Sequence, residues 1–461
     1  MSSRTLDEWL LAVEALHPRD IEMGLDRSRE VADRLGLGTH LGTSATIITV
    51  GGTNGKGSTC AMLESILLAA GFRVGLYIKP HFLRFNERAR IDGVDASDAD
   101  LIEQFEAVEA ARVLGAALGA AQDPADAAAI EPAIELTYYE FTTLAILNLF
   151  SKKALDVVIL EVGLGGRLDT VNLIDADCSV VTGIAIDHVE YLGATREAIA
   201  FEKAGIFRRG RPAICADPEP PASLIEHAGR IGADLWLIGR DFNYSGDRQQ
   251  WNFAARGQRR SSLAYPALRG ANQMLNASGA LAALSALRDR LPVSQQAVRT
   301  GLMAVELTGR FQVLPGRPTV IYDVAHNPQA AASLAHNLDG MGYFPYTLAI
   351  FGAMRDKDIA GILATMTGRV DRWFMTGLPL GRAATAEHLA LELETMKSAT
   401  VKAGSGGRSE EQEDERAEIL TFTSPAEAWS AARESAGPDD RIVAFGSFHT
   451  VAGVMKARDA G

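Results

Sequence analysis

The 461-residue sequence has little cysteine, no excess of positive charge and no long apolar run. Its three cysteines form no CxxC pair, which argues against both a disulfide framework and a zinc knuckle. A formal net charge of −13 argues against a nucleic-acid or anionic-membrane partner, because both need a basic surface. No apolar run reaches the roughly 18 residues of a membrane span, and the start lacks the order of an export signal. We therefore expect a cytoplasmic protein, a monomer, without nucleic-acid or membrane partners.

The most informative segment is GGTNGKGST at 51–59, which follows an apolar run and precedes a helical pattern. Its glycines let the backbone bend and present N–H groups, Lys56 adds a positive charge, and the helix near Ser58 presents its positive dipole end. These features predict a triphosphate site. The spacing differs from the common P-loop, because Val50 replaces its first glycine and Gly57 separates Lys56 from Ser58. A glycine-rich turn of an unrelated α/β protein is the alternative. The predicted nucleotide-binding residues are Thr53, Asn54, Gly55, Lys56, Gly57, Ser58 and Thr59.

Apolar segments typical of strands alternate with helical segments along the chain. The expected strands are 47–50, 73–78, 156–162, 178–186, 319–324, 346–351, 419–422 and 442–445. This alternation predicts parallel sheets covered by helices. The chain also exceeds the roughly 250–300 residues of a single core. We predict an α/β protein with an N-terminal P-loop-type, mostly parallel-sheet ATPase domain at 1–305 and a smaller, Rossmann-like C-terminal domain at 306–461.

Two expected strands end in side chains that could hold a metal ion. Strand 156–162 carries Glu161 near its end, and strand 178–186 runs into Asp187 and His188. Open α/β sheets place ligands at this edge. Magnesium on a nucleotide takes one or two carboxylates together with hydroxyl, phosphate and water oxygens, so Ser58 and Glu161 fit. His188 is less expected for a hard cation. Glu161 and His188 could each instead be an ordinary strand-end residue.

Many further motifs occur in order along both halves of the chain. They are KPHFLRFNERARIDG at 79–93, TYYEFTTLA at 137–145, LEVGLGGRLDTVN at 160–172, DHVEYLG at 187–193, FEKAGIFR at 201–208, GRFQ at 309–312, DVAHNPQAA at 323–331, RDKDIAG at 355–361 and FGSFHTVA at 445–452. With GTNGKGS at 52–58, this set resembles the dihydrofolate synthase/folylpolyglutamate synthase family of the Mur ligase superfamily. The resemblance implies ATP-dependent addition of L-glutamate to dihydropteroate and to the γ-carboxylate of reduced folates, through an acyl phosphate.

The resemblance also implies roles for single residues. Lys56, Glu161, His188, Lys203 and Arg310 would be catalytic; Ser58, Glu161 and His188 would hold one or two Mg²⁺ ions. Lys203 matches a lysine that is carbamylated in the family, although an ordinary salt-bridging lysine is the alternative. The nucleotide would also contact Asn276, Arg310, Asp323 and His326, and the substrates would contact Thr137, Tyr139, Asp169, Thr170, Ser447 and His449. Tyr139 could instead be core, and Ser447 with His449 could be a capped strand-to-helix turn.

Two positions depart from the family pattern. Lys79 stands where a serine that can ligand the second magnesium is common, and protonated lysine cannot ligand a metal. It could instead hold a phosphate or a substrate carboxylate. Thr308 replaces a proline, with little expected effect. Three other functions remain: a monofunctional folylpolyglutamate synthase, another Mur-type ligase, disfavoured because only 50 residues precede Gly51, and a non-catalytic nucleotide switch.

Overall fold

The structure is a computed structural model that describes residues 4–19, 21–38, 41, 45–120, 132–247, 249–403 and 418–460. Its contacts divide the chain into two compact units. The first comprises Met1–Ile186, Leu192–Pro266 and Met274–Val305, and the second comprises Asp187–Tyr191, Ala267–Gln273 and Glu306–Gly461. The main stretch of the second unit therefore begins at Glu306. Two short segments that precede this residue in the sequence also belong to the second unit.

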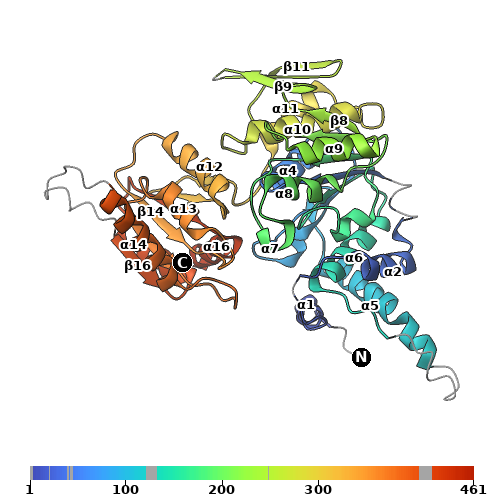
Figure 1. Ribbon diagram of the computed structural model, residues 1–461, viewed down its shortest axis with the longest axis horizontal. Helices are drawn as coiled ribbons and strands as arrows, with labels where there is room; N and C mark the ends of the chain where they lie inside the picture. The colour runs from blue at the N-terminus through green and yellow to red at the C-terminus, as the bar shows by residue number, and fades with distance from the viewer. Residues whose placement is uncertain are drawn as a thin grey trace. The chain divides into compact units, whose positions relative to one another are not determined.

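The first unit is built on an eight-stranded sheet (Figure 1). In spatial order its strands are β4 (Val94–Asp95), β3 (Ala89–Ile91), β2 (Val74–Tyr77), β5 (Val157–Glu161), β1 (Thr46–Gly51), β6 (Cys178–Val181), β7 (Pro212–Cys215) and β8 (Asp234–Leu237). The six strands from β2 to β8 are parallel, and β3 and β4 are antiparallel. All six residues of β1 are buried, as expected for a strand covered on both faces. The predicted mostly parallel sheet is thus confirmed.

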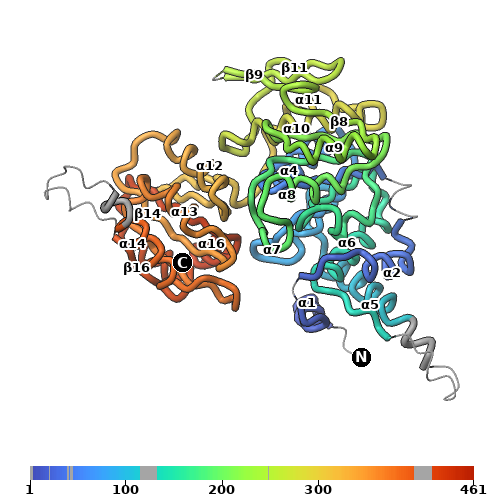
Figure 2. Tube along the Cα trace, viewed as in Figure 1, coloured from blue at the N-terminus to red at the C-terminus, as the bar shows by residue number. Residues whose placement is uncertain are grey.

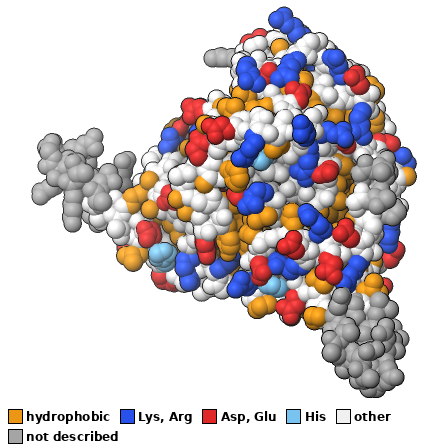
Figure 3. Space-filling view, turned by 45° about the vertical axis from the view of Figure 1, so that its right-hand side comes forward, with side chains coloured by type: hydrophobic (Ala, Val, Ile, Leu, Met, Phe, Trp, Pro, Cys, Tyr) orange, Lys and Arg blue, Asp and Glu red, His pale blue; other side chains and the backbone are white. Residues whose placement is uncertain are grey.

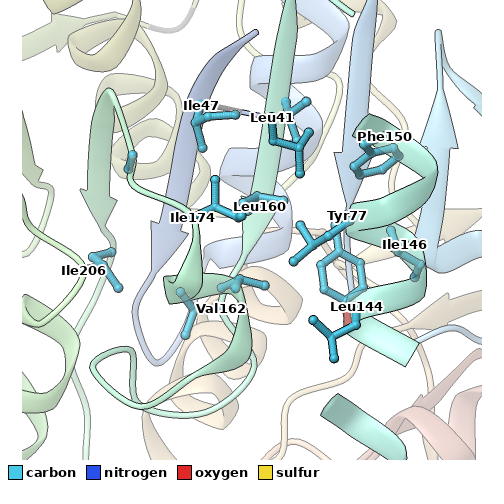
Figure 4. Close-up of a cluster of buried hydrophobic side chains, with 14 of the residues drawn as sticks. Leu41, Ile47, Tyr77, Leu144, Ile146, Phe150, Leu160, Val162, Ile174 and Ile206 are labelled. Atoms are coloured by element: carbon cyan, nitrogen blue, oxygen red, sulfur yellow. The ribbon is translucent and has the colours of Figure 1, made fainter. Parts of the chain in front are cut away.

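Helices cover this sheet. They are α1 (Leu6–Glu14), α2 (Asp26–Arg34), α4 (Lys56–Ala69), α5 (Asp98–Ala120), α6 (Tyr138–Ser151), α8 (Arg196–Ala204), α9 (Ala222–Ile231), α10 (Gln273–Ala286) and α11 (Gln295–Ala304), with short 3₁₀ helices η1 (Phe85–Arg88) and η3 (Thr170–Leu173). Helices α1 and α2 pack on α5 and α6 (Figure 2). One hydrophobic cluster joins Ile47 and Leu160 of the strands to Leu144 and Phe150 of α6 (Figure 4). Helix α4 packs against β1, β2 and β5 and against α11. These contacts fix the beginning of α4 at the end of β1.

A small antiparallel sheet follows β8 in the first unit. It consists of β9 (Phe242–Gly246), β10 (Trp251–Ala255) and β11 (Gln258–Leu263). Trp251 and Phe253 are buried, whereas their neighbour Asn252 is exposed, so this sheet has one packed face. The aromatic residues in this polar stretch of sequence are the side chains that anchor it.

The second unit has a six-stranded sheet. Its order is β12 (Gln312–Leu314), β13 (Thr319–Tyr322), β17 (Arg441–Phe445), β14 (Thr347–Phe351), β15 (Arg372–Thr376) and β16 (Glu418–Phe422), parallel except for β12. The helices are α12 (Pro328–Asp339), α13 (Ile359–Met366), α14 (Ala386–Ala403), α15 (Pro425–Ser435) and α16 (Phe448–Ala460); α7 (Val189–Leu192) lies in the segment that begins at Asp187. Phe351, Trp373 and Phe445 pack together in its core. The predicted second α/β layer is confirmed.

One predicted strand is too long. The run 178–186 was expected to continue to the Asp187–His188 pair, but β6 ends at Val181. Beyond it, the carbonyl of Gly183 accepts hydrogen bonds from Thr53 and Asn54 instead of from a neighbouring strand. Asp187 and His188 are consequently residues of an irregular segment, and His188 has a positive φ of 50°.

Charged side chains of both signs are interspersed on the face of the molecule shown in Figure 3. No helix in the described part of the chain is both long and apolar enough to cross a membrane.

Candidate active site

The turn from β1 into α4 has the conformation of a phosphate-binding loop. Gly52 and Gly55 have φ values of 139° and 95°, which L-amino acids with side chains rarely adopt. Gly55 is the N-cap residue of α4, and no side chain caps the helix there among the described residues. The first N–H groups of α4 are therefore directed at the turn without a capping side chain. Together with the helix dipole they form a surface for an anion.

The loop is held in place by the segment that follows β6. The Thr182 hydroxyl donates to the carbonyl of Asn54 at 2.7 Å, and Thr53 N donates to the carbonyl of Gly183 at 2.8 Å. The Thr53 hydroxyl donates to the carbonyl of Ala185 at 3.1 Å. These bonds pre-organise the loop, so little ordering remains to be done when a phosphate group binds.

Two lysine amines lie at the loop. Lys56 Nζ donates to the carbonyls of Gly52 and Thr53, each at 3.0 Å. Lys203 Nζ, from α8, donates to the same Gly52 carbonyl at 2.8 Å and is 4% exposed as a residue. Two positive charges beside uncapped helix N–H groups suit a polyanion such as a triphosphate. The structure therefore brings the predicted Lys56 and Lys203 together.

Asn276, on α10, lies against the same loop. A Cβ atom built on Gly55 would be 2.3 Å from Asn276 Oδ1, so only glycine fits at this position. Sequence reasoning expected Asn276 near the adenine; the structure places it beside the glycine turn, at the beginning of α4. It is a buried residue.

Ser58 and Glu161 can hold a magnesium ion as far as their chemistry and location show. Ser58 is in the first turn of α4, and Glu161 ends β5 in register with Val50 of β1, directly before the loop. Both are buried, and both offer oxygen ligands. No group of three or more His, Cys, Asp or Glu side chains with metal-binding geometry occurs among the described residues. A nucleotide-bound magnesium needs only one or two protein carboxylates, so this donor set fits.

A chain of polar groups lies near the end of β5. The Tyr139 hydroxyl donates to Asp169 Oδ1 at 2.7 Å, and the N–H groups of Gly163 and Leu164 donate to Asp169 Oδ2 at 2.8 and 3.0 Å. Lys79 Nζ donates to the Tyr139 hydroxyl. Burial lowers the pKa of Lys79 to about 8, against the opposite influence of the Asp169 and Glu161 carboxylates. The structure thus assembles the predicted Tyr139 and Asp169 and adds Lys79 to them.

Thr137 and Thr170 are both used locally. Thr137 is the N-cap of α6: its hydroxyl accepts from Glu140 N at 3.2 Å, and it donates to Glu140 Oε2. Thr170 is a buried residue in η3, which Asp169 caps through Val171 N. Both threonines flank the Tyr139–Asp169 pair, and Thr137 has a capping role of its own.

In the second unit, Asp323 organises the turn around Arg310. Its two carboxylate oxygens accept from Phe311 N at 2.9 Å and from Ala325 N at 2.8 Å. Burial raises the pKa of Asp323 to about 6, while these backbone N–H groups and Arg310 act in the opposite direction. The Arg310 guanidinium lies over the ring of Phe448, 5.1 Å from its centre. Arg310 and Asp323 are therefore neighbours, as predicted.

Asp187 gathers several cationic or polar groups of the second unit. Lys357 Nζ lies 2.7 Å from Asp187 Oδ1 and 3.5 Å from His188 Nε2. His326 Nε2 lies 3.4 Å and Asn327 Nδ2 3.5 Å from Asp187 Oδ2. Although burial opposes it, the hydrogen bond from His326 and these nearby charges hold the pKa of Asp187 well below its usual range. The predicted His188 and His326 are brought together through this carboxylate.

Ser447 and His449 begin α16. The Ser447 hydroxyl accepts from Thr450 N at 3.1 Å and lies 2.8 Å from the Thr450 hydroxyl. This is a helix cap, the alternative that the sequence had left open for the segment. His449 is exposed. The contacts of these two residues are those of a capped strand-to-helix turn, and their predicted role with glutamate stays a prediction.

Sequence reasoning left Lys357, Asp187 and Thr182 out of the site. Asp187 directly precedes His188, and Lys357 lies in the RDKD motif, so both could have been selected from motifs already noted. Thr182 follows an ordinary buried strand, and nothing in its local sequence distinguishes it. Its hydrogen bonds to the loop appear only when the strands are assembled.

Comparisons with known proteins agree with this arrangement. Residues 113–284 match the Mur ligase middle domain family, and residues 309–448 match the Mur ligase, glutamate ligase domain family. The chain is 42% identical over 455 residues to the dihydrofolate synthase/folylpolyglutamate synthase of Escherichia coli (strain K12), covering 99% of this chain and 96% of that protein.

Solved structures show the same likeness. Escherichia coli FolC in complex with DHPP and ADP has a TM-score of 0.86 and 41% identity, over 99% of this chain and 98% of that one. A bifunctional folylpolyglutamate synthase/dihydrofolate synthase with Mn, AMPPNP and L-glutamate bound has a TM-score of 0.83 and 40% identity, with the same coverage. Its fold, its loop and its identity to these proteins mean that the chain belongs to the dihydrofolate synthase/folylpolyglutamate synthase family of Mur ligases.

Proposed function

We propose that this protein is an ATP-dependent ligase that adds L-glutamate to dihydropteroate, forming dihydrofolate, and to the γ-carboxylate of reduced folates. The observation that carries the proposal is the uncapped, lysine-flanked glycine turn at α4, with a carboxylate and a tyrosine–aspartate pair close by in the same sheet. The 42% identity to the Escherichia coli enzyme over nearly the whole chain supports the choice of substrates.

The reaction makes an amide from a carboxylate, which is a poor electrophile. An oxygen of the substrate carboxylate attacks the γ-phosphorus of ATP, the bond from that phosphorus to the ADP oxygen breaks, and an acyl phosphate forms. The amine of glutamate then attacks the acyl carbon. Phosphate leaves with the bonding electrons, the amine loses a proton to solvent, and the amide remains. Phosphoryl transfer requires mainly alignment and neutralisation of charge.

The residues of the chain would supply these two requirements. The N–H groups of the 51–57 loop and the ammonium of Lys56 would hold the phosphates, and Arg310 would add a further positive charge. Ser58 and Glu161, with His188 as a further ligand, would hold Mg²⁺, which when bound neutralises phosphate charge. Asp169 and Tyr139 would contact the pterin, the carboxylate bonding its amino-pyrimidine edge.

We assign residues 1–305 to ATP and pterin binding and residues 306–461 to glutamate ligation. Within the first domain we propose that Lys203 reacts with CO₂, so that a carbamate replaces the amine that donates to Gly52. An intact mass of active enzyme, measured under CO₂-saturated and CO₂-depleted conditions, tests this. A bare amine in fully active enzyme would contradict the modification.

The test of the function is ADP release by the purified chain with ATP, Mg²⁺ and L-glutamate. Dihydropteroate and tetrahydrofolate are offered in separate tubes, and glutamate is omitted from the controls. Glutamate-dependent ADP release in both tubes is expected. Release with tetrahydrofolate alone would identify a monofunctional folylpolyglutamate synthase, and no release in either tube would refute the ligase function.

The proposal includes a cytoplasmic monomer that works on small molecules without a nucleic-acid or membrane partner. The net charge of −13 supports this, because it provides no overall attraction to polyanions. Sedimentation of the purified chain would give the mass of one copy if the proposal is correct.

A further inference from the structure

Lys79, the residue after Ile78 at the end of β2, places an ammonium group beside the Tyr139–Asp169 pair. Nζ lies 4.4 Å from the ring centre of Tyr77 and 4.2 Å from that of Tyr139, and it donates to the Tyr139 hydroxyl. The backbone N–H of Lys79 donates to Glu161 Oε2 at 2.8 Å. The cation is thus held against two aromatic rings, on a backbone that is bonded to the proposed magnesium ligand.

The ammonium group has more donors than its protein neighbours use. It carries three N–H donors, and the Tyr139 hydroxyl is its hydrogen-bond acceptor within the described part of the chain. None of the ion pairs among the described residues includes Lys79. Asp169 is nearby, but its oxygens accept from Tyr139, Val171, Gly163 and Leu164. A partly buried cation without a paired carboxylate is unfavourable unless a ligand supplies the anion.

We propose that Lys79 binds the carboxylate of the acid substrate, the group that becomes the acyl phosphate. This inference rests on the proposed function and identifies a specificity residue within it. The ligand class is an aromatic or heteroaromatic acid: Tyr139 and Asp169 would hold the ring, and the Lys79 ammonium would hold the carboxylate. A charge-assisted hydrogen bond of this kind is stronger than a neutral one and orients the oxygen that reacts.

The competing explanation is purely structural. Lys79 could serve only to support the Tyr139 hydroxyl and, through it, the Asp169 carboxylate. Removal of the ammonium would then disturb the ring site, and it would weaken charged and uncharged ligands to the same extent. The two explanations therefore differ in how the effect depends on the charge of the ligand.

The experiment measures equilibrium binding of two ligands to the full chain. Dihydropteroate carries the carboxylate, and 6-methyl-7,8-dihydropterin has the ring without it. The proteins are wild type, Lys79→Met, Lys79→Arg and the control Lys152→Met, a surface lysine of the same unit that pairs with Glu103. For Lys79→Met we expect binding of dihydropteroate to weaken about 10- to 100-fold and binding of the methylpterin to stay within about threefold.

The other variants sharpen the result. Lys79→Arg keeps the positive charge and should recover part of the lost affinity, and Lys152→Met should bind like wild type. Equal weakening of both ligands in Lys79→Met, or no weakening of either, would overturn the proposal. If Lys79→Met does not fold, wild type is compared with dihydropteroate and its carboxamide. A loss of about 10- to 100-fold for the carboxamide supports the proposal, and equal affinity overturns it.

The inference and the proposed function fail in different ways. Wild type that releases ADP with dihydropteroate, while Lys79→Met binds this acid normally, would refute the role of Lys79 alone. Wild type that binds dihydropteroate through its carboxylate but consumes no ATP would refute the ligase function and leave the role of Lys79 standing.

Discussion

Two strand-to-helix turns, one in each unit, start their helices in opposite ways. The turn from β1 to α4 has Gly55 at the N-cap with a φ of 95° and no capping side chain. The turn from β13 to α12 has Asn327 at the N-cap, whose side chain accepts from Ala330 N at 2.9 Å, and it has Pro328 in the first position. Proline has no N–H to satisfy. The N-terminus of α12 is satisfied by its own chain, whereas that of α4 can take an anion.

The charges at the two turns differ in the same direction. Lys56 and Lys203 both donate to the Gly52 carbonyl before α4. Before α12 stands Asp323, which is spent on the backbone N–H groups of Phe311 and Ala325. A parallel strand leading into a helix is therefore not sufficient for phosphate binding. The capping residue and the charges around it decide whether the helix terminus is available.

Replacement of Lys56 by alanine should have the largest effect on this comparison. The change removes a charge that would act on the phosphates, and we expect ADP release to fall about 1,000-fold, or about 4 kcal/mol of transition-state stabilisation. The lysine bonds only to carbonyls of its own loop among its recorded contacts, so circular dichroism should stay unchanged. Lys152→Ala serves as the control. Normal turnover of Lys56→Ala would contradict the role of the loop.

Replacement of Gly55 by alanine should show why the α4 terminus needs glycine. The new Cβ would lie 2.3 Å from Asn276 Oδ1, at a φ that alanine disfavours. We expect nucleotide affinity to fall about 100-fold, because a loop that must shift can no longer point its N–H groups at phosphate. Isothermal calorimetry with ADP measures this.

The control for Gly55→Ala lies at the other end of the same helix. Gly71 has a φ of 87°, but a Cβ there would meet no atom within 4 Å. Gly71→Ala should therefore cost about 1 kcal/mol of stability and leave ADP affinity unchanged. Equal loss of ADP affinity in both variants would mean that strain in α4, and not the shape of the loop, is responsible.

The contrast between the two turns could be largely predicted from the sequence, because each motif is contiguous. GGTNGKGS at 51–58 contains its glycines, its lysine and its helix start within one segment, and all of them act locally. The Tyr139–Asp169–Lys79 group draws instead on three separate segments, and only the assembled sheet brings them together. The resemblance to a family supplied Tyr139 and Asp169. The contact of Lys79 with them could not be predicted, since lysine is uncommon there and the local pattern says nothing about its neighbours.

The missed strands have a similar cause. β7 (Pro212–Cys215) and β8 (Asp234–Leu237) have four residues each, too short for their apolar pattern to be distinguished from a loop. The end of β6 was misplaced because the residues after Val181 are apolar, although Gly183 bonds to the glycine loop instead of to a strand. Tertiary hydrogen bonds, and not hydrophobicity, set these boundaries.

The body of α4 provides a pH-dependent test of stability. Burial raises the pKa of Glu64 to about 7, while Arg90 lowers it and Asp95 raises it further. Between about pH 4.5 and 7 the folded state binds more protons at this site than the unfolded state, so the free energy of unfolding falls as the pH rises through that window. We expect Glu64 to account for a decrease on the order of 2 kcal/mol.

Glu64→Gln cannot titrate and should lack this part of the decrease. Urea unfolding of both proteins at pH 5, 6, 7 and 8 gives the difference in slope. This difference is unaffected by the constant cost of leaving Arg90 without its carboxylate partner, which lies 3.2 Å away in wild type. Parallel curves for the two proteins would show that Glu64 ionises normally.

Replacement of Asn327 by alanine tests the satisfied helix end and should have the smallest effect. The variant loses the cap on Ala330 N, and we expect the free energy of unfolding to fall by about 1 kcal/mol, as for other N-caps. Tryptophan fluorescence during urea unfolding reports it through the buried Trp373 of the second unit. Asn327→Ser keeps a capping oxygen and should recover most of the loss. If alanine and serine destabilise α12 equally, its terminus does not depend on a side-chain cap, and the proposed difference from the uncapped α4 terminus would no longer explain which one binds phosphate.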